Sequence, residues 1–219
     1  MKTELIFLGP PACGKGTQTT KLAEYLGFPH VDTGSLLRAE IKKETPAGIE
    51  AKSFIDRGRL VPVELVSRII KNRLSEEDCK NGYILDGFPR SLEQAEQLTK
   101  INQELDKNNS SNFIAVYFDI DESILIERIV NRRSCSKCGE IYNLAFKVPS
   151  KENICDKCGG ELVQRKDDTK EVAHSRFETY YRETAPLIDY YKKMGVLKTI
   201  DANGTIDKVW ERLKEVIKV

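Results

Sequence analysis

Short apolar runs alternate with longer segments of helical periodicity along most of this chain. Runs rich in apolar, aromatic and β-branched residues are typical of buried strands, and five occur: Leu5–Leu8, His30–Val31, Tyr83–Leu85, Phe113–Phe118 and Val196–Ile200. Apolar residues that recur every three or four positions predict helices, and these cover Lys15–Leu26, Ser35–Glu44, Ile49–Arg57, Val63–Ser75, Ser91–Asp106, Asp121–Asn131, Ser175–Tyr191 and Ile206–Lys218. The alternation predicts an α/β fold with a five-stranded parallel sheet and helices on both of its faces.

Two features interrupt this pattern. Pro186 lies inside the segment Ser175–Tyr191, so that helix is predicted to kink or break there. Residues 131–168 contain four cysteines, three glycines and few large apolar side chains. A segment with so little to bury needs another source of stability. We therefore expect a small inserted subdomain held by a metal ion.

The charge balance limits the partners that the whole surface can bind. The 219 residues include 35 Lys+Arg and 34 Asp+Glu, a net charge of +1, which argues against a surface that grips nucleic acid or anionic lipid everywhere. The longest apolar runs are far shorter than the roughly 18 residues of a membrane span, and the N-terminal run is too short for a secretion signal. We expect a cytoplasmic protein, and a monomer because the sequence shows no large apolar stripe.

Four cysteines predict a metal site. Cys135, Cys138, Cys155 and Cys158 form two C-x-x-C pairs separated by sixteen residues, a spacing typical of tetrahedral Zn²⁺ sites. A reducing compartment disfavours disulfides. Four thiolates complete the coordination sphere, so the zinc would be structural rather than catalytic. A set of free or redox-active thiols is the alternative.

A glycine-rich segment, Gly9–Thr17, joins the first predicted strand to the first helix. Its spacing allows successive backbone N–H groups to surround a phosphate, and Lys15 and the helix N-terminus add to the attraction. The match to G-x-x-x-x-G-K-[ST] is imperfect because Gly16 separates Lys15 from Thr17. A glycine-rich turn with a surface lysine is the alternative, but the order strand, loop, lysine, helix favours a phosphate-binding loop.

The third predicted strand ends in the charged segment Asp86–Arg90. The carboxyl ends of parallel strands form the ligand crevice of an open sheet, so Asp86 and Arg90 are expected to face the phosphate loop. Asp86 suits a Mg²⁺ ion held through water, and the fork of Arg90 suits a phosphate. For this segment alone, a structural ion pair within the turn is the alternative.

Two motifs carry a resemblance to a known family. Gly9–Gln18 resembles the G-x-P-G-x-G-K-G-T-Q loop of adenylate kinases, in which a glycine after the lysine is normal. Asp86–Arg90, followed by Gln94, resembles the D-G-[FYI]-P-R-x-x-x-[NQ] signature of nucleoside monophosphate kinases. Ala12 stands where the family usually has glycine, at a cost of about 1 kcal/mol if the position needs positive φ. Ser35 replaces an aspartate that is common in the family.

The resemblance implies a P-loop kinase that transfers a phosphoryl group reversibly from Mg-ATP to AMP, giving two ADP. The resemblance implies that ATP is bound by Ala12, Cys13, Gly14, Lys15, Gly16, Thr17, Arg128, Arg132, Ile141, Tyr142 and Gly204. It implies that AMP is bound by Thr33, Arg38, Arg59, Leu60, Val61, Gly87, Phe88, Pro89, Arg90, Gln94, Arg165 and Arg176. The expected catalytic cations are Lys15, Arg90, Arg132, Arg165 and Arg176, and Thr17 and Asp86 are expected to hold Mg²⁺ through water.

The resemblance also divides the chain into segments. Residues 1–31, 62–130 and 169–219 form the core, residues 32–61 bind the nucleoside monophosphate, and residues 131–168 form a lid that carries one structural Zn²⁺. Closure of the lid over both nucleotides would exclude water, the competing acceptor. The accepting phosphate is already ionised and needs no strong base, so His30 and His174 are expected to be packing or surface residues.

Two other functions stay open at this point. One keeps the reaction and changes the acceptor to GMP, CMP or UMP. The other is a zinc-ribbon ATPase that binds nucleic acid. The insertion carries eight Lys+Arg and six Asp+Glu, and four thiolates with one Zn²⁺ would bring it to neutrality, which disfavours nucleic-acid binding. We therefore expect ATP, AMP and ADP as partners, and neither nucleic acid nor a membrane.

Overall fold

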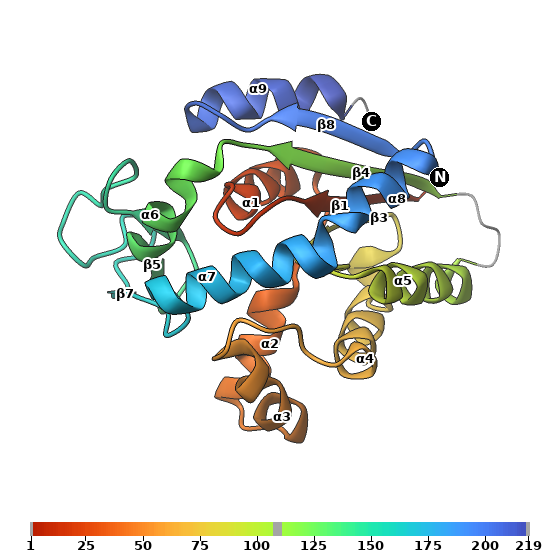
Figure 1. Ribbon diagram of the computed structural model, residues 1–219, viewed down its shortest axis with the longest axis horizontal. Coiled ribbons are helices and arrows are strands. Elements are labelled where there is room, and N and C mark those ends of the chain that lie inside the picture. Colours follow the sequence, from red (N-terminus) through yellow and green to blue (C-terminus); the bar gives the residue numbers. More distant parts are fainter. Residues whose placement is uncertain (1, 107–110, 218–219) are drawn as a thin grey trace.

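A five-stranded parallel sheet forms the centre of the structure, a computed structural model that describes residues 2–106 and 111–217 (Figure 1). In the order β2-β3-β1-β4-β8, its strands are β2 (His30–Asp32), β3 (Gly82–Asp86), β1 (Thr3–Leu8), β4 (Asn112–Asp119) and β8 (Leu197–Asp201). Each neighbouring pair is parallel. The predicted α/β fold is therefore confirmed.

Helices cover both faces of this sheet. The α-helices of the described residues are α1 (Lys15–Leu26), α2 (Thr33–Lys42), α3 (Pro46–Ile55), α4 (Val63–Leu74), α5 (Leu92–Leu105), α6 (Leu125–Val130), α7 (Lys170–Thr179), α8 (Pro186–Lys193) and α9 (Ile206–Val216). Short 3₁₀ turns occupy Glu77–Cys79 and Glu122–Ile124. Successive side chains of a strand point to opposite faces: Ile6 packs in the cluster that includes α4 and α5, and Phe7 in the cluster that includes α1 and α9.

Three helices begin earlier than the sequence predicts. α2 begins at Thr33 because the Asp32 side chain caps it, α3 begins at Pro46 after the Thr45 cap, and α7 begins at Lys170 because the Thr169 hydroxyl caps it. In each case a polar side chain just before the helix fixes the start, rather than the first apolar residue of the periodic pattern.

The predicted break at Pro186 is confirmed. After α7 the chain forms a π-helical segment, Tyr180–Thr184, in which the Ala185 N–H donates to the Tyr180 carbonyl at 2.9 Å, and α8 begins at Pro186. Proline lacks an N–H, so it starts a helix more readily than it continues one. Lys218, the last residue of the final predicted helix, lies outside the described residues.

The insertion at residues 131–168 contains a small antiparallel sheet that the sequence analysis did not predict. β5 (Arg132–Cys135) lies between β6 (Ile141–Asn143) and β7 (Leu162–Val163). The buried cluster of the insertion consists of Cys135, Tyr142, Cys155 and Leu162. Such a small core agrees with a segment that depends on another source of stability.

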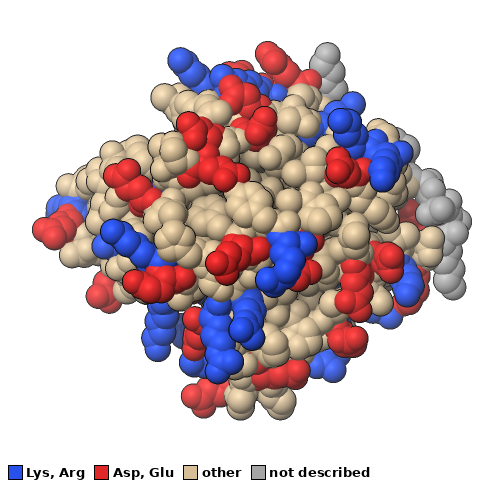
Figure 2. Space-filling view, in the orientation of Figure 1, with Lys and Arg blue, Asp and Glu red and all other residues tan. Residues whose placement is uncertain are grey.

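The surface mixes charges of both signs. On the face that Figure 2 shows, Lys and Arg side chains are interspersed with Asp and Glu. Among the helices formed by residues 2–106 and 111–217, none is long and apolar enough to cross a membrane.

Candidate functional site

The loop between β1 and α1 contains three residues with positive φ, Gly9, Ala12 and Gly14. φ is +63° at Ala12 and +96° at Gly14, which is the N-cap of α1. A β-carbon at Gly9 would lie 2.9 Å from the Cys13 Sγ and 3.1 Å from the Phe118 carbonyl oxygen. Ala12 therefore takes the left-handed conformation that glycine adopts at lower cost. The N-terminus of α1 opens onto this loop, an arrangement suited to a phosphate.

Lys15, in the first turn of α1, folds its ammonium group back over this loop. Its Nζ donates to the carbonyl oxygens of Gly9 at 2.6 Å and Pro10 at 3.2 Å, and lies 3.3 Å from the Cys13 Sγ. These contacts hold a positive charge at the loop, where a bound phosphate would be its counter-ion.

Asp86 ends β3 with its side chain buried. The Thr19 hydroxyl donates to its Oδ2 at 3.4 Å, and the His30 Nε2 lies 3.8 Å from the same oxygen. Burial alone raises the carboxyl pKa, but the nearby His30 imidazole and the charge of Lys15 outweigh burial and lower the pKa of Asp86. A carboxylate therefore faces the phosphate loop at neutral pH.

The two histidines lie in different surroundings. His30 is partly buried between α1 and Asp86, with its ring nitrogens 3.0 Å from the Thr19 hydroxyl and 3.4 Å from that of Thr20. His174 is exposed on α7. His30 therefore packs against the site beside Thr19, whose hydroxyl donates to Asp86, whereas His174 is a surface residue.

Arg90 is held at three points in the turn after β3. Its N–H donates to the Gln94 Oε1 at 2.7 Å, its Nε donates to the Gly87 carbonyl at 2.8 Å, and its carbonyl accepts from the Thr184 hydroxyl at 2.7 Å. Gly87 has a φ of +81°, and a β-carbon there would lie 2.9 Å from an Arg90 nitrogen. The backbone of this turn therefore fixes the guanidinium at the cavity wall.

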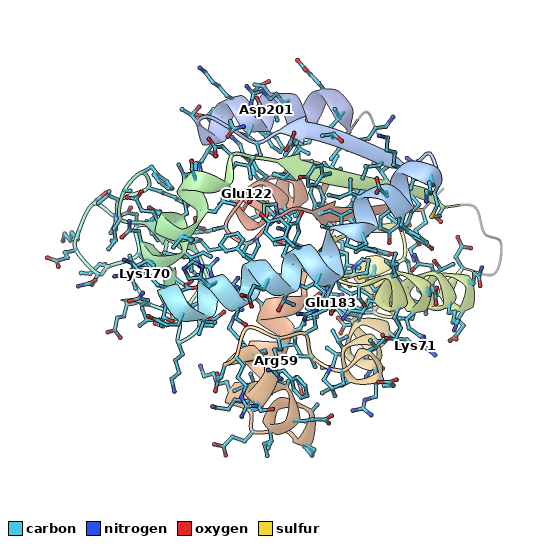
Figure 3. The ribbon with its side chains drawn as sticks, viewed as in Figure 1. Arg59, Lys71, Glu122, Lys170, Glu183 and Asp201 are labelled. Atoms are coloured by element: carbon cyan, nitrogen blue, oxygen red, sulfur yellow. The ribbon has the colours of Figure 1, made fainter. Side chains whose placement is uncertain are left out.

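The arm formed by α2 and α3 is tied to α7. The Ser175 hydroxyl donates to the Arg57 carbonyl at 2.8 Å, and the Thr179 hydroxyl donates to the Gly58 carbonyl at 3.2 Å. Figure 3 shows Arg59 on the same loop, beneath α7. The Thr33 hydroxyl is buried and has no hydrogen-bond partner in the described part of the chain. A buried polar group needs a hydrogen-bond partner, and because Thr33 lines the cavity, a bound molecule could supply one.

Asp168, which the sequence analysis did not single out, joins two of the predicted arginines. Its carboxylate accepts two hydrogen bonds from Arg132, one of them from Nε at 2.8 Å, and its Oδ1 lies 3.4 Å from Nη1 of Arg176. Asp167 accepts from the same Arg176 nitrogen at 3.1 Å. The Asp168 side chain is 0% exposed, so these arginines are its counter-ions.

Arg165 and Arg176 lie in a crowded positive region. The pKa of each falls to about 10, chiefly through burial and then through the charge of Arg132. The Arg165 Nε donates to the Ser134 hydroxyl at 2.9 Å, which ties this arginine to β5. Arginines that are held together against their mutual repulsion attract a polyanion strongly.

These groups line a cavity of about 700 Å³, a volume within the usual range of ligand sites. The predicted site residues that line it are Ala12, Cys13, Gly14, Lys15, Gly16, Thr17, Thr33, Arg38, Arg59, Leu60, Val61, Asp86, Gly87, Pro89, Arg90, Gln94, Arg128, Arg132, Ile141, Tyr142, Arg165, Arg176 and Gly204. Phe88, which was also predicted to bind AMP, does not line the cavity, because Phe88 is 1% exposed and packs in the core.

Phe146 is a cavity residue that the sequence analysis missed. Its ring centroid lies 5.1 Å from the guanidinium carbon of Arg128, and both residues line the cavity. The Arg128 Nε is buried and has no partner among the residues that the structure describes. A ring beside a planar cation suits a flat aromatic base. Phe146 follows no periodic pattern, so the sequence carried no local signal for it.

The insertion lies over the phosphate loop. The Ile141 Cδ1 is 3.6 Å from the position that a β-carbon on Gly16 would occupy. Further out, the Lys157 Nζ is 3.7 Å from the Glu24 Oε1 on α1. The insertion and the core therefore meet along one wall of the cavity.

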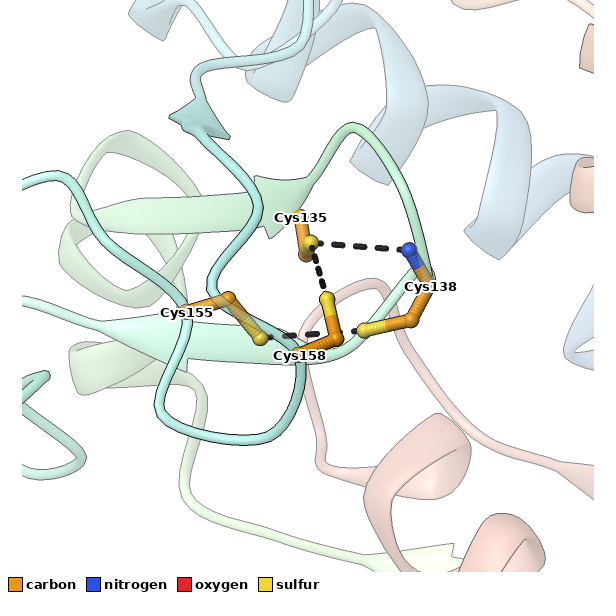
Figure 4. Close-up of side chains that lie close together, drawn as sticks. All are labelled: Cys135, Cys138, Cys155 and Cys158. Atoms are coloured by element: carbon orange, nitrogen blue, oxygen red, sulfur yellow. Dashed lines mark hydrogen bonds between the residues drawn. The ribbon is translucent and has the colours of Figure 1, made fainter.

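The four cysteines of the insertion converge on one point (Figure 4). Their Sγ atoms all lie within 4.8 Å of one another, at 3.5 Å between Cys135 and Cys158 and 3.7 Å between Cys138 and Cys155. Sulfur atoms around a tetrahedral Zn²⁺ with bonds of about 2.3 Å lie about 3.8 Å apart. The cluster therefore fits a zinc ion, and four thiolates leave it no open position.

Both C-x-x-C pairs form the same turn. The Gly139 N–H donates to the Cys135 carbonyl at 3.1 Å, the Gly159 N–H donates to the Cys155 carbonyl at 2.8 Å, and both glycines have positive φ. The Cys138 N–H also points at the Cys135 Sγ, at 3.5 Å, and is the main cause that lowers the pKa of Cys135 to about 6. These turns hold the sulfur atoms in place as metal ligands.

Comparisons with a family model and with curated proteins identify the same family. The family model described as adenylate kinase matches residues 7–196. A curated adenylate kinase of Clostridium tetani is 46% identical over 213 residues, covering 97% of each chain. One of a Geobacillus species is 45% identical over 213 residues, again 97% of each chain. One of Archaeoglobus fulgidus is 44% identical over 214 residues, covering 98% of this chain and 97% of the relative.

Proposed function

The chain belongs to the adenylate kinase family of nucleotide-binding phosphotransferases, and we propose that it transfers a phosphoryl group reversibly from Mg-ATP to AMP, giving two ADP. The observation that carries this proposal is one cavity lined, among the described residues, by nine Lys and Arg side chains, including the five expected catalytic cations Lys15, Arg90, Arg132, Arg165 and Arg176. The phosphates of two nucleotides that meet in this cavity would neutralise those charges.

ATP is assigned to the side of the cavity formed by the phosphate loop and the insertion. The segment Ala12–Thr17 would surround its phosphates, since the loop presents a helix N-terminus and the Lys15 charge. The base would lie against Phe146 and Arg128, whose Nε is buried without a partner in the described residues. Ile141, Tyr142 and Gly204 complete this side.

AMP is assigned to the opposite side, between the α2–α3 arm and the turn after β3. The Gln94 Oε1 accepts from the Arg90 N–H, so the amide group is oriented with its NH₂ as the free donor. Adenine offers an acceptor at N1, whereas guanine carries a proton there, so this orientation favours AMP over GMP. The unpartnered hydroxyl of Thr33, the guanidinium of Arg38 and the strip Arg59–Val61 support the same assignment.

Thr17 and Asp86 are the groups that we assign to Mg²⁺, through water. Both line the cavity, and the lowered pKa of Asp86 keeps that carboxylate charged at neutral pH. Bound there, the ion would supply positive charge that neutralises part of the phosphate charge of ATP.

The chemistry requires position and positive charge more than a base. Phosphoryl transfer passes through a loose transition state whose charge is spread over equatorial oxygens. Preorganised cations stabilise that charge without reorganisation, and Asp168 holds two of them, Arg132 and Arg176, before substrate binds. The acceptor is a phosphate oxygen that is already ionised, which removes the need for a general base.

We assign residues 131–168 to a lid and residues 32–61 to an acceptor arm, with the remaining chain as the core. The contacts of Ile141 and Lys157 with α1 support a lid that closes over the phosphates and excludes water. Zn²⁺ held by the four cysteines would stabilise the lid and take no part in transfer.

A panel of acceptors tests this function. The purified chain is mixed with Mg-ATP and, in separate reactions, AMP, GMP, CMP or UMP, and the nucleoside diphosphates are measured. The proposal expects a kcat/KM for AMP at least about 100-fold above the others, the discrimination of roughly 3 kcal/mol that one or two buried hydrogen bonds supply. A preference for another monophosphate, or ATP hydrolysis stimulated by nucleic acid without transfer, would reject it.

A further inference from the structure

Asp32 and Ser35 both contact the guanidinium of Arg38 at the first turn of α2. Ser35 stands where the family usually has aspartate, and a carboxylate comes instead from Asp32, which ends β2 and lines the cavity. We propose that Asp32 is a positioning residue that holds the guanidinium of Arg38 ready for the phosphate of the acceptor nucleotide. The inference rests on the proposed function, because that function assigns Arg38 to the acceptor.

The contacts join the three side chains across the first turn of α2. Arg38 Nη2 donates to the Asp32 Oδ2 at 3.3 Å and to the Ser35 hydroxyl oxygen at 3.0 Å. The Ser35 hydroxyl in turn donates to the same Oδ2. One guanidinium nitrogen is therefore fixed by two oxygens, and the remainder of the group stays at the cavity wall.

Gly34 provides the space for this arrangement. A β-carbon at Gly34 would lie 2.9 Å from Arg38 Nη1 and 3.3 Å from the Asp32 Oδ1. That Oδ1 also accepts from the Gly34 N–H at 3.0 Å. The guanidinium therefore lies against the backbone of the first turn, a position that a side chain at 34 would obstruct.

Helix geometry explains why the carboxylate can move from position 35 to position 32. Residues three apart face the same side of a helix, and the N-cap side chain reaches the N–H groups of the next turn. A carboxylate at either position therefore reaches Arg38, and a hydroxyl at the other position can bridge to it.

The charge of Asp32 also acts on the other arginines of the cavity. Burial is the main cause that lowers the pKa of Arg165, and the charges of Arg132 and Arg38 lower it further. Asp168 and Asp32 act in the opposite direction. Asp32 therefore reduces the repulsion among arginines on the acceptor side, as Asp168 does at the base of the lid.

Four variants test this role: Asp32→Asn, Asp32→Ser, the double variant Asp32→Ser with Ser35→Asp, and the control Asp56→Asn. Asparagine retains the helix cap, so a lost charge is separated from a lost helix start. Asp56 forms an exposed ion pair with Lys52 on the same arm, which makes it a matched control outside the cavity. KM for AMP, KM for ATP, kcat and Tm are measured for each.

We expect the KM for AMP to rise about tenfold in Asp32→Asn and Asp32→Ser, the size of effect of one charge-assisted hydrogen bond, with the KM for ATP and the Tm of Asp32→Asn nearly unchanged. The double variant returns the KM for AMP to within about threefold of the original chain. An unchanged KM for AMP in both single variants, an equal rise in the KM for ATP, or a double variant no better than Asp32→Ser overturns the inference. If the unaltered chain does not phosphorylate AMP, it is the proposed function that fails.

Discussion

The Asp168 carboxylate accepts two hydrogen bonds from the Arg132 guanidinium, although 36 residues separate them in the chain. Arg132 begins the insertion at β5, and Asp168 lies at its end, just before α7. Because Asp168 also approaches Arg176 at 3.4 Å, one buried carboxylate ties both ends of the insertion to the core and arranges two of the proposed catalytic cations.

Asp168→Asn should therefore affect both stability and activity. Asparagine keeps the shape of the fully buried Asp168 side chain but removes the counter-ion of two largely buried arginines. Loss of one partner of a buried ion pair costs about 3–5 kcal/mol. Urea denaturation measures the free energy of unfolding, and kcat should fall in the same variant. Asp78→Asn is the control, since Asp78 forms an exposed pair with Arg73 and its loss costs about 1 kcal/mol or less. Equal effects of the two substitutions would contradict this assignment.

Lys15→Met should lower kcat by about 100-fold or more, because one preorganised cation at the transferring group contributes roughly 3 kcal/mol to transition-state stabilisation. The fold should persist, since the Lys15 ammonium contacts loop carbonyls and packs no core. Lys21→Met is the matched control on the same helix, where Lys21 pairs with Asp207 at the surface. Steady-state kinetics and circular dichroism compare the two, and near-normal turnover in Lys15→Met would remove this residue from the mechanism.

Ala12→Gly should stabilise the chain by about 0.5 kcal/mol. The left-handed backbone at Ala12, with φ of +63°, costs an L-residue about 1–2 kcal/mol, and the extra freedom of glycine in the unfolded chain offsets part of the gain. Ala23→Gly, inside α1, should have the opposite sign and destabilise by about 1 kcal/mol. If both glycine variants unfold more easily by the same amount, the strain at Ala12 is refuted.

Metal removal should loosen the lid and leave the phosphate loop intact. We expect one zinc per chain by elemental analysis, and a Tm lower by roughly 5–10 °C after chelation, the shift that about 2–3 kcal/mol produces in a chain of this size. Cys138→Ser should reproduce this loss, whereas Cys79→Ala should retain the zinc because Cys79 lies in the core, away from the cluster. Protein that contains no zinc and whose Tm does not respond to chelation would exclude a structural zinc.

The sequence predicted those parts of the fold that local patterns specify. Leu5–Leu8 and Tyr83–Leu85 are buried on both faces of the sheet, and Phe113–Phe118 is buried or partly buried throughout, so all three read as continuous apolar runs. β6 and β7 have three and two residues, too few for a period to be detected. They form because β5 and the cysteine turns bring them together, which is a property of tertiary structure.

The candidate site was predictable to a similar extent. Glycine spacing and the D-G-F-P-R segment marked the residues whose backbone conformation is special, such as Gly87 with its φ of +81°. The pairing of Asp168 with Arg132 joins distant residues and leaves no local pattern, and the ring of Phe146 meets Arg128 only because the insertion folds back over the core. Contacts of this kind required the structure.

The stoichiometry of the reaction tests the central claim most directly. ATP and AMP are mixed with Mg²⁺ and the purified chain, and phosphorus NMR follows ATP, ADP, AMP and inorganic phosphate. A closed, water-excluding cavity for two nucleotides predicts two ADP formed for each AMP consumed, return to ATP and AMP when ADP alone is supplied, and no release of phosphate. Release of inorganic phosphate in proportion to the loss of ATP, with AMP unchanged, would contradict it.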